Sequence, residues 1–190
     1  MDQRFDETGN LMSDELEILE KIADECGFEC HGVADSKKLV VRPEVRDMCA
    51  VGKCHVYGKS WACPPACGDI EEFDAMFKQH SMCFIVQSVG QLEDEFDFET
   101  MVETEQIHKE RFFAFGDKLR EAGLSPVMLA AGTCRVCPSC TYPDEPCRFP
   151  NKRMVSMEAS GLVVAEACGL AGIPYNHGNN TLAYSSCAVL

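Results

Sequence analysis

Two groups of closely spaced cysteines are the residues of this sequence whose types and spacing best suit chemistry. The downstream group begins with Cys134-Arg-Val-Cys137-Pro-Ser-Cys140 and continues with Cys147. The upstream group consists of Cys49, Cys54, Cys63 and Cys67. Thiolates at such spacing bind soft metal ions and iron–sulfur clusters. The sequence therefore predicts a metal-binding protein, and all the cysteines of both groups are candidate ligands.

The downstream group has the C-x2-C-x2-C spacing of the bacterial ferredoxin run, which holds a [4Fe-4S] cluster. Its fourth cysteine departs from that run, because six residues separate Cys140 from Cys147 where ferredoxins have about three. A zinc site normally takes its second pair of ligands from about 12 to 20 residues away, so a third cysteine this close is unusual for zinc. We favour an iron–sulfur cluster here, with zinc as the alternative.

The upstream group, C-x4-C-x8-C-x3-C, matches no standard spacing. Pro64-Pro65 stiffens its loop, and Gly58 and Gly68 permit close approach of backbone N–H groups to cluster sulfurs. The group could hold a second cluster, complete the first one or bind zinc. A second cluster is the favoured interpretation, so we expect one or two [4Fe-4S] clusters in all.

Each residue near these groups can have a functional role or an ordinary structural one. Cys30 and His55 are further candidate ligands, although core packing and surface exposure are the simpler roles for them. Tyr57 and Trp61 are expected to shield a cluster from water, which tunes its potential. The remaining cysteines fall on apolar helix faces or in predicted strands and are expected to pack in the core: Cys26, Cys83, Cys168 and Cys187.

Charge and composition exclude several classes of function. A formal net charge of −14 opposes binding to nucleic acids and to anionic membranes, which attract Lys and Arg. No tract approaches the ~20 apolar residues of a membrane span, and the acidic N-terminus lacks the apolar core of a signal peptide. We expect a cytoplasmic protein. In that reducing compartment an odd count of 13 cysteines indicates metal or redox chemistry rather than disulfides.

The spacing of apolar residues predicts alternating helices and strands. Three helices should begin at caps supplied by Ser13, Asp69 and Thr100, and Gly27 and Gly123 should end the first and third. A single turn is expected at Pro43, and a fourth helix over 156–170. The expected strands cover 32–35, 39–41, 83–89, 125–131 and 182–190.

These elements predict a single-domain layered α/β sandwich with two cysteine-rich metal-binding loops on one side. Residues 1–12 are expected to form a flexible N-terminus, and residues 13–190 a single metal-binding α/β domain.

Three stretches together resemble a known family. They are Cys54-His-Val-Tyr-Gly-Lys-Ser-Trp61-Ala-Cys63-Pro-Pro65, the downstream cysteines with Cys147-Arg148-Phe-Pro150, and Ser156-Met-Glu158-Ala-Ser-Gly161-Leu-Val. The chain is similar over about residues 15–190 to the predicted metal-binding proteins of domain of unknown function 2284, found largely in anaerobic bacteria and archaea. The resemblance implies metal binding at these cysteines, with iron–sulfur as the expected form, and implies no particular reaction.

Three functions from different classes are compatible with these residues. The first is an iron–sulfur protein that passes single electrons to a redox protein partner. The second is an iron–sulfur enzyme with an open iron site that acts on a small sulfur-containing or anionic substrate. The third is a zinc-stabilised interaction module. A basic patch in the acidic chain could offset a cluster's negative charge or bind an anionic partner: Arg135, Arg148, Lys152 and Arg153.

Overall fold

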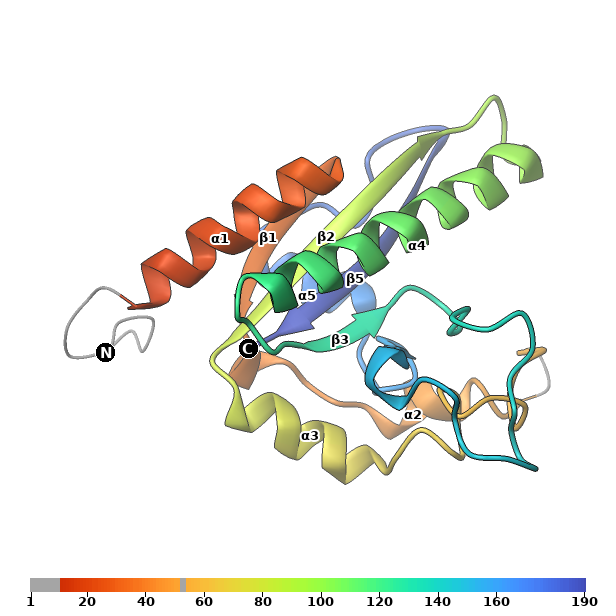
Figure 1. Cartoon of the computed structure of the whole chain (residues 1–190). Helices are drawn as coiled ribbons and strands as arrows, with labels where there is room; N and C mark the ends of the chain where they lie inside the picture. The colour runs from red at the N-terminus through yellow and green to blue at the C-terminus, as the bar shows by residue number, and fades with distance from the viewer. Residues whose placement is uncertain (1–10, 52–53) are drawn as a thin grey trace.

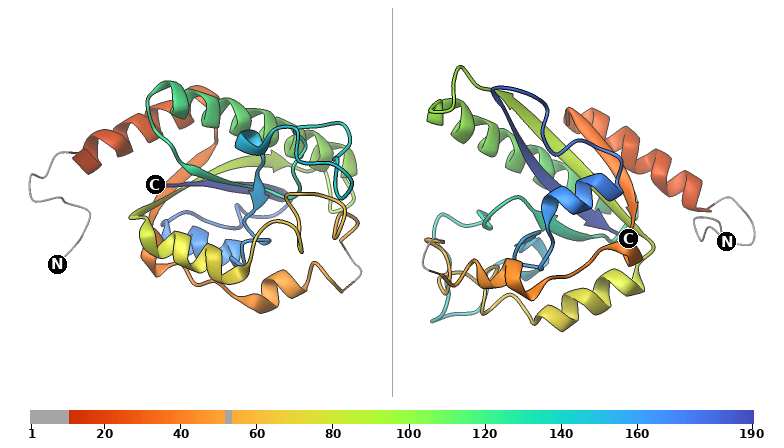
Figure 2. Two further views of the ribbon diagram at one scale, coloured as in Figure 1. Left: turned by 60° about the horizontal axis from the view of Figure 1, so that its bottom comes forward. Right: turned by 180° about the vertical axis from the view of Figure 1, so that it is seen from behind.

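A five-stranded sheet runs through the centre of the molecule, and helices cover both of its faces (Figures 1 and 2). The computed structural model describes residues 11–51 and 54–190. The strand order is β1-β2-β5-β3-β4. Only β3 and β4 are parallel, and the other neighbouring strands are antiparallel. The strands are β1 (Cys30–Asp35), β2 (Met82–Gln91), β3 (Val127–Ala130), β4 (Val155–Ser156) and β5 (Thr181–Val189).

The two longest helices, α1 (Leu11–Cys26) and α4 (Phe98–Glu121), lie on one face of the sheet. Their apolar side chains meet alternate residues of the central strands, because successive strand residues point to opposite faces. Phe84 of β2, Phe112 and Phe115 of α4 and Leu19 of α1 are almost fully buried in this layer. Gly27 and Gly123 adopt positive φ angles just after these helices, as predicted.

The opposite face carries α2 (Pro43–Asp47), α3 (Ile70–Gln79) and α5 (Val164–Leu170). The fold also contains two 3-10 turns, Ser36–Lys38 and Pro150–Lys152. Phe77 of α3 and Ile85 of β2 belong to the apolar core on this side. The arrangement is a three-layer α/β/α sandwich, which confirms the predicted fold class.

The two cysteine-rich segments lie side by side at one end of the sandwich. Figure 1 shows the segment after β3 (green to blue) beside the segment between α2 and α3 (orange to yellow), and both views of Figure 2 agree. The indole Nε1 of Trp61 donates to the carbonyl oxygen of Glu145 at 2.9 Å, which joins the two segments directly. The loops therefore gather on one side of the sandwich, as expected.

Two predicted helix caps were wrong, and one was right. The first helix begins at Leu11, so Ser13 lies inside it. The long helix begins after Asp97, whose side chain accepts a hydrogen bond from the Thr100 N–H at 3.1 Å. Asp and Thr are both good capping residues, and the acidic turn before the helix decides in favour of Asp97. The capping box of Asp69 and Glu72 at the start of α3 is confirmed.

The predicted helix over 156–170 is wrong in its first half. Ser156 ends β4, where it pairs with Ala130, and α5 begins only at Val164. Gly161 has φ +89°, a conformation that ends any helical path before that point. The predicted strand over 39–41 is also absent, and only Val41 forms an isolated bridge, with Leu162.

Most of the predicted flexible N-terminus, residues 1–12, lies outside the described residues, although α1 already begins at Leu11. Within the described part of the chain, no helix combines the length and apolarity needed to span a bilayer.

Candidate metal centre

The downstream cysteines line one recess at the surface. All four of them, Cys134, Cys137, Cys140 and Cys147, contribute to its wall. The upstream segment supplies the opposite wall through Ser60, Trp61 and Ala62, so the recess forms only when the two segments meet. Cys147 is included in spite of its unusual spacing. The structure thus brings together the whole downstream set that the sequence predicted.

Cys140 lies where backbone N–H groups converge on its sulfur. Burial alone would raise the pKa of this thiol, but hydrogen bonds from the backbone of Trp61, Tyr142 and Thr141 and from the Ser60 hydroxyl lower the pKa overall. Donors of this kind favour the thiolate, which is the form that binds metal. Hydrogen bonds to ligand sulfurs also tune the potential of an iron–sulfur cluster.

Local hydrogen bonds hold the downstream segment in shape without regular structure. The Thr141 hydroxyl donates to the carbonyl oxygen of Pro146 at 2.9 Å, and the N–H of Glu145 donates to the carbonyl oxygen of Thr141 at 3.0 Å. Arg148 reaches back to the carbonyl oxygen of Ser139 at 2.8 Å. These bonds fold the stretch between Cys140 and Cys147 into a closed loop. The long spacing to Cys147 is therefore compatible with a shared recess.

The upstream cysteines are gathered too, and they are less exposed. Burial raises the pKa of Cys49, and the neighbouring thiols of Cys54, Cys63 and Cys67 raise the pKa further. Burial likewise raises the pKa of Cys63 and of Cys67, which are 7% and 5% exposed. The upstream thiols therefore form a second thiol cluster, and two of its members, Cys63 and Cys67, are more deeply buried than any thiol of the downstream recess.

Arg46 of α2 is a functional candidate that sequence reasoning missed. Its guanidinium donates to the Cys67 sulfur at 3.5 Å and also to the carbonyl oxygen of Gly68. The positive charge of Arg46 opposes the effect of burial on the pKa of Cys67. A cation beside a thiolate offsets the negative charge of a thiolate-bound metal centre. No local pattern marks this residue, because its partner lies 21 positions along the chain.

The two thiol clusters are neighbours. The Cys63 sulfur lies 3.5 Å from the Thr133 hydroxyl, directly before Cys134, and the charge of Cys134 acts on the Cys63 thiol. Arg153 lines the downstream recess, donates to the Trp61 carbonyl oxygen at 3.2 Å and acts electrostatically on Cys67. A charge at one thiol cluster would thus act on the thiols of the other.

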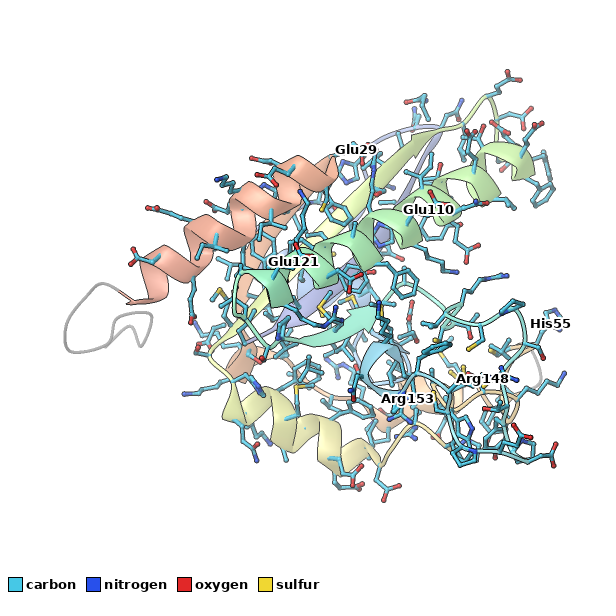
Figure 3. The ribbon with its side chains drawn as sticks, viewed as in Figure 1. Glu29, His55, Glu110, Glu121, Arg148 and Arg153 are labelled. Carbon is cyan, nitrogen blue, oxygen red and sulfur yellow. The ribbon has the colours of Figure 1, made fainter. Side chains whose placement is uncertain are left out.

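The four residues of the predicted basic patch do not all lie at the recess. Arg148 and Arg153 lie at the recess among the cysteine loops, whereas Glu29, Glu110 and Glu121 lie on the side of α1 and α4 (Figure 3). Arg135 and Lys152 line other hollows nearby.

Trp61 lines the recess, and its ring packs edge-on against Tyr142 with centroids 4.9 Å apart. Tyr57 is 38% exposed and does not contribute to the recess wall. His55 is exposed at the outer edge of the loops (Figure 3).

The remaining cysteines belong to the sandwich. Cys83, Cys168 and Cys187 are fully buried in the core beneath α3 and α5, as predicted. Cys30 packs against the edge of that core, and burial raises the pKa of its thiol. Cys26 packs in the same manner against the core on the other face. These residues behave as small apolar side chains.

The donors of both groups are thiols, which bind zinc and iron–sulfur clusters alike. A single zinc ion requires its sulfurs within about 3.8 Å of one another, given Zn–S bonds of about 2.3 Å in a tetrahedron. Among the described residues, no three Cys, His, Asp or Glu side chains converge closely enough to hold one ion. In a cluster each thiolate binds a different iron, so its ligands stand around a recess rather than at one point. The four thiols around the downstream recess are candidate ligands for such a cluster.

Comparison with family models identifies the class of protein. Residues 32–190 match the family described as predicted metal-binding protein, domain of unknown function 2284. The chain therefore belongs to this family of predicted metal-binding proteins, as its motifs indicated. The comparisons with curated proteins and with solved structures returned no match.

Proposed function

We propose that this protein is a cytoplasmic iron–sulfur protein that binds a [4Fe-4S] cluster at the downstream recess and a second one at the upstream thiols. The observation that carries the proposal is the single recess walled by Cys134, Cys137, Cys140 and Cys147. A cluster bound there would accept and release single electrons. The chain supplies the thiolates, the N–H donors to Cys140 and the enclosure of the upstream set.

The proposed role is electron transfer to an acidic redox protein. The recess opens to the surface at Cys140, so a partner can approach this end of the molecule. Arg148 and Arg153 line the recess and are exposed, in a chain whose net charge is −14. A local basic rim of this kind steers an acidic partner toward the site. The upstream set, in which Cys63 and Cys67 are buried, is adjacent through the contact of Cys63 with Thr133.

The first test is the content of iron, acid-labile sulfide and zinc in protein purified without oxygen. We expect iron and sulfide near eight per chain if both sets are filled, or near four if only the downstream set is filled, since each cubane holds about four of each. In Cys137→Ala the content should fall by about four. Cys26→Ala is the matched control, because Cys26 packs against the core far from the recess, and its metal content should be unchanged.

Two outcomes separate this proposal from its rivals. Zinc near one or two per chain without sulfide would indicate a structural zinc protein instead. Iron and sulfide that cannot be reduced and reoxidised reversibly in a spectroelectrochemical titration would contradict the electron-transfer role.

A further inference from the structure

A separate cavity of about 280 Å³ lies beside the upstream thiols. It is lined by the end of α4, the start of β3, the segment 150–155 and Phe73 of α3. Cys67 is the one cysteine among the described lining residues. The volume is close to the lower end of small-molecule sites, which begin at about 300 Å³. The cavity can therefore hold a small molecule but not a nucleotide.

Part of the cavity wall is apolar. Val127 and Phe73 are half-buried and supply accessible apolar surface, whereas Leu129 and Met154 are almost fully covered. The Cys67 thiol, which is also buried, lies on the same wall. Apolar walls of this kind favour a ligand with a hydrocarbon body and give little to a fully hydrated inorganic ion.

The rim of the cavity is cationic. Arg120, Lys152 and Arg153 contribute to it, all are exposed, and no carboxylate is among the described residues of the wall. Arg120 and Lys152 share one carboxylate, Asp117, with N–O distances of 2.6 and 3.6 Å. Arg153 donates to a neutral carbonyl group. Three cations facing one carboxylate leave an excess of positive charge in an otherwise acidic protein.

We propose that this cavity binds a small organic monoanion, a carboxylate with a short apolar body. The carboxylate would sit at the rim between Arg120, Lys152 and Arg153, where charge-assisted hydrogen bonds are available. The apolar body would lie against Val127 and Phe73. Binding itself requires no metal. Contact between the bound molecule and an upstream metal centre rests on the proposed function, because Cys67 would have to be a ligand of that centre.

The test measures benzoate binding to the full chain, purified without oxygen, by isothermal titration calorimetry. Wild-type protein should bind benzoate, and the neutral isostere benzamide should bind at least about tenfold more weakly, because a charged hydrogen bond contributes about 1.5–3 kcal/mol. Arg120→Gln and Lys152→Gln should each weaken benzoate binding by about tenfold. Inorganic phosphate should bind more weakly than benzoate, since it lacks an apolar body.

The matched control is Lys78→Gln, which removes a cation of α3 whose ion-pair partner is Asp74 and which does not line the cavity. Its affinity for benzoate should equal that of the wild type. Absence of benzoate binding, equal binding of benzamide or phosphate, or unchanged affinity in the Arg120→Gln and Lys152→Gln double variant would overturn the inference.

Iron and sulfide are measured in the same samples. Benzoate binding to protein that lacks both would sustain the cavity and refute the proposed cluster function. Iron-loaded protein that does not bind benzoate would sustain the proposed cluster function and refute the inference about the cavity.

Discussion

The sandwich and the cysteine loops of this protein are stabilised in different ways. In the sandwich, two apolar cores are buried on either side of the sheet, and five cysteines serve as packing residues there: Cys26, Cys30, Cys83, Cys168 and Cys187. The loops have almost no regular structure, and single hydrogen bonds such as that of Trp61 to Glu145 cross-link them. A fold can thus keep one residue type inert in one region and concentrate it as a ligand set in another. The difference predicts that the sandwich is stable by itself and that the loops depend on metal.

Removal of metal should therefore unfold the cysteine loops and leave the sandwich folded, and this is the largest expected effect. Binding of a structural metal is coupled to the folding of its ligand loop. After anaerobic chelation, we expect hydrogen exchange of the amides in residues 134–147 to accelerate by about 100-fold or more. Amides of β2 and β5 should keep their protection, and they are the internal control. Parallel loss of protection in sheet and loops would show that the two regions form one cooperative unit.

Acid should act on the sandwich through His108. This imidazole is fully buried between Ser88 and Ser186, at 3.1 and 2.7 Å, and desolvation by burial, with nearby Arg111 and Lys109, lowers its pKa to about 3. The unfolded state takes up a proton below about pH 6.5, whereas the folded state remains neutral to about pH 3. Stability should fall by about 1.4 kcal/mol per pH unit in that window, and not above it.

The measurement is the free energy of unfolding of wild type and His108→Gln from pH 7.5 to 4. Gln retains hydrogen-bonding capacity and cannot titrate, so the variant should lose this part of the pH dependence, and effects common to both proteins cancel in the difference. Identical slopes in the two proteins would contradict the assignment to His108.

Gly161 connects the sandwich to the upstream loop, and Gly161→Ala should damage that connection. A Cβ there would lie 2.8 Å from side-chain atoms of Ile70 and Val41 and 3.2 Å from the Arg42 nitrogen, at φ +89°. Both ends of the upstream segment thus meet at this residue. We expect a loss of about 2–3 kcal/mol in unfolding free energy, with upstream iron released before downstream iron.

Gly172→Ala is the matched control for this substitution. Its φ is also positive, +72°, but no atom lies within 4 Å of the added Cβ. It should cost only about 1 kcal/mol from backbone strain and leave the iron content unchanged. An equal loss of iron in both variants would show that Gly161 has no specific role in positioning the loop.

Trp61→Phe should have the smallest effect. It removes the hydrogen bond to Glu145 while an aromatic ring remains against Tyr142. The loss should be about 1 kcal/mol or less, detectable as faster release of iron to a chelator. Trp61→Tyr is a useful comparison because it also lacks the indole N–H. Release at the wild-type rate in both variants would indicate that the contact between the loops does not depend on this bond.

The sequence alone predicted the α/β sandwich, the two cysteine groups and most of the elements. These features depend on local signals, such as the period of apolar residues, the Asp69–Glu72 capping box and the glycines after α1 and α4. The predicted helix was wrong at residues 156–163. There Ser156 pairs with β3, and the chain turns at Gly161 before α5 begins. Tertiary contact decided that segment, because pairing with a strand outweighs a weak helical preference.

Only the tertiary structure decided which residues meet. The approach of Cys63 to Thr133 and Cys134, the bond from Arg46 to Cys67 and the cationic cavity all join segments that are far apart along the chain. Periodicity and capping act over a few residues, whereas these contacts depend on how the whole sandwich orders its strands. The sequence by itself thus determined that thiols are available for metal. The fold determined that the downstream thiols line one recess at the surface and that the upstream thiols lie next to it, two of them buried.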